Sequence, residues 1–402
     1  MGAKVDTVID REQRLLLFLL AFDPAASPFA HEFRGGTSSV DWHRFEQLVY
    51  RHRVAALVHA GACKVGGIDM PGGLSAQLAE AVQSNAHVYM RAVAETSVIA
   101  AKLRDAGIGF VLLKGLGVAA KYYPEPSQRE MIDVDLLVES QRFDEAEALV
   151  VGRGFRRFYP GFEITDRVRR SFKSIHNAFS FARGDDGLQI DLHWRMVQNP
   201  ALLPWLESEW PSLTRWDSSA GRDLPMLKPA PHFVYIMVHG AKSGWARLKW
   251  LVDIDRVVRG LSAEEASEVA RITRHQNLEP LVAASLGLSQ QLLGTPLPSE
   301  FQQIVETQDV SRLHQLEMPM IFGPERARQH RLGDWRHFAA RIRHSLLLHK
   351  GSGYRLKALM LEIARPLDLK VLPLPPQALW TLPIISPVLG IGRALARMFS
   401  RQ

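Results

Sequence analysis

Two neighbouring segments decide the fold of this chain: Phe110-Val-Leu-Leu-Lys-Gly-Leu-Gly-Val-Ala-Ala-Lys-Tyr-Tyr123 and Met131-Ile-Asp-Val-Asp-Leu-Leu-Val138. In the first, an apolar run of strand length meets Lys114-Gly115, and apolar residues at helical spacing follow. The second segment is an apolar run interrupted by two acids. The order strand, glycine turn, helix, strand is typical of a nucleotide-binding site.

Asp133 and Asp135 are two residues apart on the second predicted strand. Alternate side chains of a strand point to the same face, about 6–7 Å apart, so the two carboxylates share a face. Adjacent like charges on an apolar strand are costly unless a cation binds them, and Mg²⁺ prefers such oxygen ligands. The alternative is an exposed strand end with two solvated acids.

Lys114 and Gly115 lie where the first strand ends and the helix begins. Glycine lets the backbone approach a ligand closely, and the free N–H groups of a helix's first turn attract anionic oxygens such as those of a triphosphate. The alternative interpretation of Lys114 is a solvated lysine at a strand end.

A third strand is predicted at Gly187-Leu-Gln-Ile-Asp-Leu-His-Trp194, with Asp191 at its centre and Gln189 and His193 on the same face. Nucleotidyl transfer with two metal ions needs a third carboxylate beside the first two. Such a group helps to hold the catalytic cation and can take the proton of an attacking hydroxyl.

Four motifs in order resemble a family, the bacterial uncharacterised nucleotidyltransferases of the DNA polymerase β-like superfamily. They are Leu-Leu-Lys-Gly at 112–115, Arg129 ahead of Asp-Val-Asp-Leu-Leu-Val at 133–138, Ile-Asp-Leu-His-Trp at 190–194, and Val-His-Gly-Ala-Lys at 238–242 with Leu-Lys-Trp-Leu-Val-Asp at 248–253. The resemblance covers roughly residues 41–298.

The resemblance implies a small mixed sheet flanked by helices, a Mg²⁺ site at Asp133, Asp135 and Asp191, and an NTP as nucleotide donor. The chain departs from the wider superfamily at Lys114-Gly115, where the serine hydroxyl that would help to bind the triphosphate is missing. Lys114 is expected to supply positive charge to the triphosphate instead. Arg129 is expected to pair with phosphate or with the acids. For Lys242 two interpretations stay open: neutralising the leaving phosphate, or helix packing.

The predicted fold class is therefore α+β, in four parts: an N-terminal helical region (1–106), a nucleotidyltransferase core (107–197), a helical domain that closes the site (198–298) and a basic helical region (299–402). The length of 402 residues suits several domains. Hydrophobic content of 47% and charged content of 23% are ordinary for a globular protein. A single cysteine, Cys63, excludes an internal disulfide framework and fits a reducing cytoplasm.

The chain's excess positive charge lies in its last third, where residues 271–402 hold 17 Lys+Arg against 9 Asp+Glu. Arginines and aromatic residues alternate within 326–357, a pattern that suits nucleic acid or an anionic surface, although a solvated basic face is the simpler interpretation. The tail carries Arg393, Arg397 and Arg401 at four-residue spacing, typical of a membrane-surface helix or of domain packing. Prolines at 383 and 387 are expected to interrupt the preceding uncharged run, so no transmembrane segment is predicted, and a cytoplasmic location, with peripheral attachment to the inner membrane as a variant, is expected.

These features predict a Mg²⁺-dependent nucleotidyltransferase with two cations, an NTP donor and an acceptor that the sequence does not identify: a small molecule, peptide, sugar or tRNA. Two rivals stay open. One is a non-catalytic NTP-binding or scaffold module on the same fold, and the other is a toxin-like enzyme that modifies tRNA.

Overall fold

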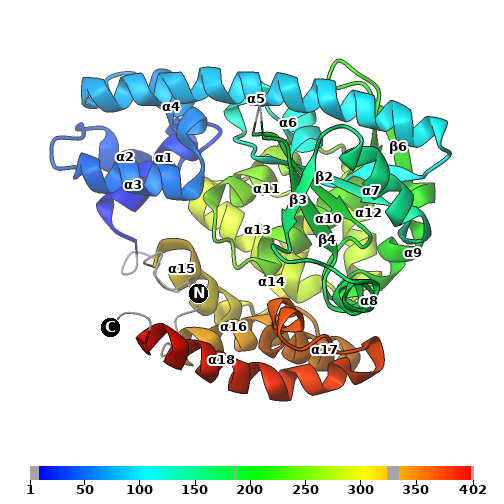
Figure 1. Ribbon diagram of the computed structural model, residues 1–402. Coiled ribbons are helices and arrows are strands. Elements are labelled where there is room, and N and C mark those ends of the chain that lie inside the picture. The colour runs from blue at the N-terminus through cyan, green and yellow to red at the C-terminus, as the bar shows by residue number, and fades with distance from the viewer. Residues whose placement is uncertain (1–8, 185–186, 324–334, 400–402) are drawn as a thin grey trace. The chain divides into compact units, whose positions relative to one another are not determined.

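The computed structural model describes residues 9–184, 187–323 and 335–399, with side chains up to residue 392. The chain divides into two compact units. Figure 1 labels the helices and strands of the described residues. Unit 1 comprises Met1–Ala100, Leu112–Val134 and Leu213–Gly323, and unit 2 comprises Ala101–Val111, Asp135–Ser212 and Pro324–Gln402. The division falls within two strands of the sheet, so it also separates Asp133 from Asp135.

The sheet is mixed, with seven strands in the order β3-β4-β5-β2-β1-β7-β6. The strands are β1 (Phe110–Leu112), β2 (Asp133–Val138), β3 (Arg156–Tyr159), β4 (Ala178–Ala182), β5 (Gln189–His193), β6 (Thr214–Asp217) and β7 (Leu224–Leu227). Strand β7 is parallel to β1, whereas β3-β4, β4-β5 and β6-β7 are antiparallel pairs. The predicted α+β class is confirmed. Strands β6 and β7 are an addition, because they lie in the segment that the sequence predicted to be helical.

Unit 1 is otherwise built of helices. They are α1 (Arg11–Leu20), η2 (Pro24–Ala26), α2 (Ala30–Phe33), α3 (Trp42–His52), α4 (Ala55–Val65), α5 (Gly72–Asp105, whose last turn belongs to unit 2), α6 (Leu116–Tyr122), η3 (Pro126–Gln128), α10 (Pro229–Lys242), α11 (Leu248–Gly260), α12 (Ala263–His275), α13 (Glu279–Leu293), α14 (Ser299–Thr307) and α15 (Ser311–Phe322). Local sequence fixes several helix ends. Capping boxes start α1 at Asp10 and α12 at Ser262, and Gly294 ends α13 in the left-handed conformation with φ of 69°.

Apolar residues at helical spacing between 41 and 62 predict a single helix there, and this prediction is wrong. Arg53 adopts the left-handed conformation with φ of 56°, so α3 ends at His52 and α4 begins at Ala55. The cause is tertiary: the Leu248 N–H donates to His52 Nδ1 at 3.1 Å, and the Arg247 side chain donates to the Arg51 carbonyl. Groups nearly 200 positions away thus satisfy the end of α3, which no local sequence signal indicates.

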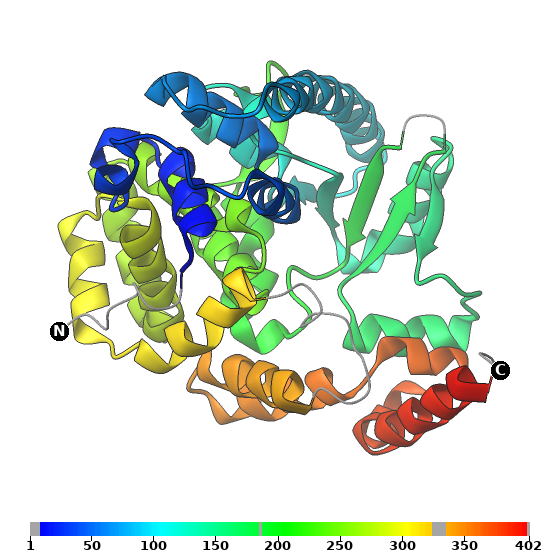
Figure 2. The ribbon, with the colours of Figure 1, turned by 90° about the vertical axis from the view of Figure 1, so that its left-hand side faces the viewer.

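In unit 2, helices pack on one face of the antiparallel strands β3, β4 and β5, which Figure 2 shows side by side. The helical elements of unit 2 are η4 (Ser140–Arg142), α7 (Phe143–Val151), α8 (Asp166–Ile175), η5 (Pro200–Leu202), α9 (Pro204–Leu213), α16 (Trp335–Leu347), α17 (Ser352–Ile363), η7 (Pro366–Lys370), η8 (Pro376–Thr381) and α18 (Leu382–Phe399), of which α7 and α8 contact β4. Phe143 of α7 and Phe172 of α8 lie with their ring centroids 5.6 Å from that of Phe179 on β4, and Trp194 completes the aromatic cluster. The opposite face of β4 and β5 is therefore the one that can hold a site.

Two local predictions in unit 2 differ from the structure. Ser140 is a residue type that favours a helix start and predicts a helix from there to Val151, but a 3₁₀ turn occupies Ser140–Arg142 and α7 begins at Phe143. The prolines at 383 and 387 do not break α18, which runs through both; Pro383 lies in its first turn, where its missing N–H costs nothing.

Part of the basic C-terminal region falls outside the described structure. Arg326, Arg328 and Arg331 lie outside the described residues, as does Arg401, and the side chains of Arg393 and Arg397 are not described. Among the helices that the structure describes, none is both long and apolar enough to cross a bilayer.

Candidate metal and nucleotide site

The β4-β5 hairpin has two chemically distinct faces. Residues directly opposite in an antiparallel pair share a face. The apolar face pairs Phe179 with Leu192 and Phe181 with Ile190, and the polar face pairs Ala178 with His193, Ser180 with Asp191 and Ala182 with Gln189. On the polar face, the β4 residues are all small. The acid and the imidazole of β5 therefore have no bulky side chain of β4 directly opposite them.

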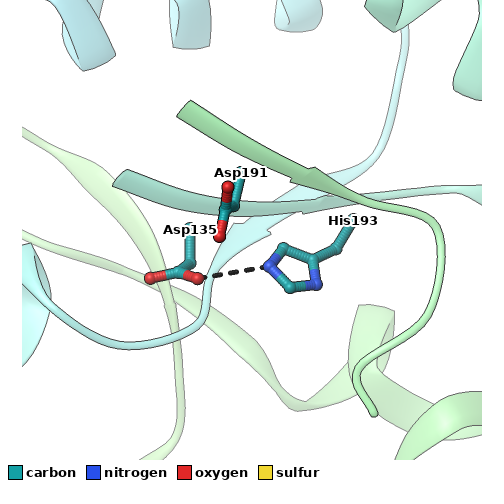
Figure 3. A group of neighbouring side chains, drawn as sticks. All are labelled: Asp135, Asp191 and His193. Atoms are coloured by element: carbon teal, nitrogen blue, oxygen red, sulfur yellow. Dashed lines mark hydrogen bonds and ion pairs between the residues drawn. The ribbon is translucent and has the colours of Figure 1, made fainter. Parts of the chain in front are cut away.

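Asp135 of β2 joins Asp191 and His193 of the neighbouring strand β5, and Figure 3 shows the three side chains together. Each offers one ligand atom, and these atoms all lie within 4.8 Å of one another. Asp135 and His193 are buried, with exposed fractions of 1% and 6%, and Asp191 is half-buried. The structure therefore brings together two of the three predicted acids within reach of one cation.

His193 and Asn177 belong to this site, and sequence reasoning did not select either as a site residue. His193 Nε2 lies 3.2 Å from Asp135 Oδ1, and Asn177 Nδ2 lies 3.1 Å from His193 Nδ1. Strand alternation from Asp191 placed His193 on the correct face and could have selected it. No signal in the sequence indicates Asn177, because it precedes β4 and reaches the site only through the β4-β5 pairing.

The donor set suits a hard divalent cation. Two carboxylates converge from adjacent strands, and carboxylate oxygens are the ligands Mg²⁺ prefers. Asp133, half-buried, is the first residue of β2, and strand alternation directs its side chain to the same side as that of Asp135. The residues present thus fit the predicted metal.

Arg129 lies in unit 1, where it forms a buried ion pair with Asp253 of α11. Its Nε and Nη2 donate to the two carboxylate oxygens, each at 2.7 Å, and the Tyr123 hydroxyl donates to Asp253 Oδ1 at 2.7 Å. Both charged side chains are only 3% exposed. Burial opposes the charge of Arg129, but Asp253 outweighs it, so the pKa of Arg129 is raised. Local sequence patterns could not pair these groups, which are 124 positions apart.

The third nitrogen of Arg129 lies at the glycine turn. Gly115 has φ of 60°, and a Cβ there would lie 3.9 Å from Arg129 Nη1 and 3.6 Å from the Asp133 carbonyl oxygen. Any other residue would be strained and would fill this space. Lys114, beside it, is half-buried.

His232 of α10 holds the start of the same turn. Its Nε2 lies 2.8 Å from the Leu113 carbonyl, to which the neutral ring donates a hydrogen bond. Burial lowers the pKa of His232 to about 4, so the ring is neutral at pH 7. The turn at Lys114-Gly115 is thus anchored through its preceding carbonyl.

Lys249 is a second buried basic side chain near Arg129 and Asp133, and sequence patterns did not indicate it. Its Nζ donates to the Glu130 carbonyl at 3.2 Å, and its exposed fraction is 5%. Burial, together with the positive charge of Arg129, lowers the pKa of Lys249 to about 7, while Asp133 acts in the opposite direction.

Lys242, by contrast, is exposed in the last turn of α10. The His239 ring of the same motif packs edge-to-face on Trp250 at 5.2 Å, which is helix packing. The role of Lys242 in a site stays a prediction.

The mixed sheet with carboxylates on adjacent strands defines an α+β protein with a site suited to divalent cations. Residues 38–294 match the model of the family described as "Uncharacterised nucleotidyltransferase". This chain belongs to that family and is a nucleotidyltransferase. A search of curated proteins found no match.

Proposed function

We propose that this protein transfers a nucleoside monophosphate from an NTP to an acceptor hydroxyl, with release of pyrophosphate, in a Mg²⁺-dependent reaction. We assign it to the DNA polymerase β-like superfamily. The observation that carries this proposal is the meeting of Asp135 and Asp191 from adjacent strands, with Asp133 two positions earlier on β2.

Asp133, Asp135 and Asp191 are the proposed metal ligands. Two Mg²⁺ ions, when bound, would neutralise triphosphate charge and stabilise both the attacking and the leaving oxygen of an in-line displacement. Asp191 is the half-buried acid of the described pair, which suits the residue that accepts the proton of the attacking hydroxyl.

The triphosphate is proposed to bind at the Lys114-Gly115 turn. Helix α6 has only seven residues, so charge here comes mainly from the side chains of Lys114 and Arg129. The guanidinium of Arg129 has two of its nitrogens on Asp253, and its Nη1 faces the glycine. Lys242 is proposed to stabilise the departing pyrophosphate. As the new bond to the α-phosphorus forms, the bond to the β-phosphate oxygen breaks.

The acceptor is a hydroxyl of a small molecule, a peptide, a sugar or tRNA. The basic surface of residues 326–357 is a candidate contact for a nucleic acid or an anionic surface, and we keep a cytoplasmic location as a prediction. A toxin-like action on tRNA would arrest growth upon expression, and Asp133→Ala would abolish the arrest.

The decisive experiment incubates purified protein with each α-labelled NTP, Mg²⁺ and a host lysate, and identifies the molecule that becomes labelled. Asp135→Asn is expected to lower labelling by about a thousandfold, since metal ligation contributes several kcal/mol to the transition state. Asp105→Asn, at an exposed position in the same unit, is the matched control and should label normally. NTP binding without any labelled product or pyrophosphate would instead identify a non-catalytic module.

A further inference from the structure

The hydrogen-bond partners of the His193 ring show whether His193 binds a metal ion itself or orients another residue that does. Its two ring nitrogens have different partners, Asn177 Nδ2 at Nδ1 and Asp135 Oδ1 at Nε2. Which nitrogen carries the hydrogen decides whether Nε2 can bind a cation, because a ligating nitrogen must present its lone pair.

The surroundings of Asn177 settle the orientation of its amide group. Its Nδ2 lies 3.4 Å from the carbonyl oxygens of Arg195 and Met196. Two carbonyl acceptors require the donor end of the amide at this position, so the group facing His193 Nδ1 is NH₂. The two longer contacts share one N–H of the amide, and the other N–H donates to His193 Nδ1 at 3.1 Å. The neutral imidazole therefore accepts at Nδ1 and carries its hydrogen on Nε2.

The turn that supplies these carbonyls is itself held in place. The N–H groups of Met196 and Val197 donate to the carboxylate of Glu207 on α9 at 3.2 and 3.3 Å. The Trp194 N–H also donates to the Asn177 carbonyl at 3.1 Å. The orientation of Asn177 is thus built into the fold.

With Nδ1 accepting a hydrogen bond, the neutral ring carries its hydrogen on Nε2, and Nε2 then presents no lone pair to a cation. Histidines that ligate metals show the opposite arrangement, in which the second ring nitrogen donates to a carboxylate or carbonyl. Here the second nitrogen receives a hydrogen bond. The Nε2–H instead points at Asp135 Oδ1, where it can fix the carboxylate of a proposed metal ligand.

We propose that His193 is a positioning residue: Asn177 holds it in the Nε2–H tautomer, and it donates to Asp135 and so orients that carboxylate toward the cation, without ligating the cation itself. This inference rests on the proposed metal site, and it adds Asn177 and His193 as the residues that shape it. The cation is then held by carboxylate oxygens alone.

The test uses Mn²⁺, a paramagnetic substitute for Mg²⁺, bound to the full-length protein. Pulsed electron paramagnetic resonance detects a directly coordinated ¹⁴N, and the wild-type spectrum is expected to lack the coupling of a ligating imidazole. His193→Gln keeps an N–H donor and should bind Mn²⁺ within about threefold of wild type. His193→Leu removes the donor and should weaken binding by about 10- to 100-fold. His337→Leu, at an exposed position in the same unit, is the matched control and should bind normally.

A coordinated imidazole nitrogen in the wild-type spectrum, lost in His193→Gln, would overturn the inference and leave the proposed transfer reaction intact. Unchanged Mn²⁺ affinity in folded His193→Leu would also overturn it. If wild-type protein bound no Mn²⁺, the metal site of the proposed function and this inference would fail together. The wild-type spectrum decides even if the leucine variant does not fold.

Discussion

The two units hold their buried charges in opposite ways. In unit 1, one carboxylate, Asp253, receives three hydrogen bonds at 2.7 Å from Arg129 and Tyr123. In unit 2, two carboxylates, Asp135 and Asp191, converge on each other and on an imidazole within 4.8 Å. The first arrangement balances opposite charges, whereas the second brings like charges together. Like charges in a sheet are costly unless a cation binds them, so we expect a cation at the Asp135–Asp191 pair, whereas the charge of Asp253 is already balanced within the protein.

Breaking the Asp253 network should have the largest effect on stability. Asp253→Asn leaves a buried guanidinium without its counter-charge and is expected to lower the free energy of unfolding by about 3 to 5 kcal/mol, measured by urea denaturation. Glu32→Gln, which removes the partly exposed partner of Arg14, is the control and should cost under about 1 kcal/mol.

Replacing the whole network separates its two roles. Tyr123→Phe/Arg129→Met/Asp253→Leu removes the charges and the hydroxyl together, so it should recover most of the lost stability. NTP binding should nevertheless stay weak, because Arg129 Nη1 is gone from the Gly115 turn. Full NTP affinity in the triple variant would show that Arg129 only stabilises the fold.

Lys249 should give unit 1 a pH-dependent stability. Its pKa falls from 10.5 to about 7 on folding, so between these values the unfolded chain binds more protons and the free energy of unfolding rises with pH. The penalty is fully present below pH 7. Between pH 7 and 8.5, wild type should gain about 1 to 2 kcal/mol relative to Lys249→Met. For the control Lys228→Met, at an exposed position in the same unit, the curve of unfolding free energy against pH should run parallel to that of wild type. A Lys249→Met curve parallel to wild type would refute the burial argument.

Substitution in the acid cluster of unit 2 should raise the free energy of unfolding, whereas Asp253→Asn in unit 1 lowers it. In the presence of a metal chelator, Asp191→Asn removes one of two neighbouring like charges. It is therefore expected to raise the free energy of unfolding by about 0.5 to 1 kcal/mol. Mg²⁺ should then stabilise wild type more than the variant, since only wild type keeps the full ligand set. Thermal unfolding with and without Mg²⁺ measures both effects. Destabilisation of the metal-free variant would mean that the cluster is structural, like Asp253.

Much of unit 2 was predictable because it depends on local pattern. The period of two in the segment 187–194 predicted β5 and the face of Asp191, and β5 pairs with β4, its neighbour along the chain. The same alternation placed Asp133 and Asp135 on one side of β2. Strands β6 and β7 were not predicted, because they are four residues each and one contains Pro225.

The sequence by itself determined where the acids, the glycine turn and the long helices lie, because side-chain alternation, helical spacing and capping act over a few residues. Only the tertiary structure decided which polar side chains contact each other. Arg129 contacts Asp253, and Asn177 contacts His193, because strand order and helix packing bring distant segments together. Hydrogen bonds of this kind act over about 3 Å in space and leave no periodic trace in the chain.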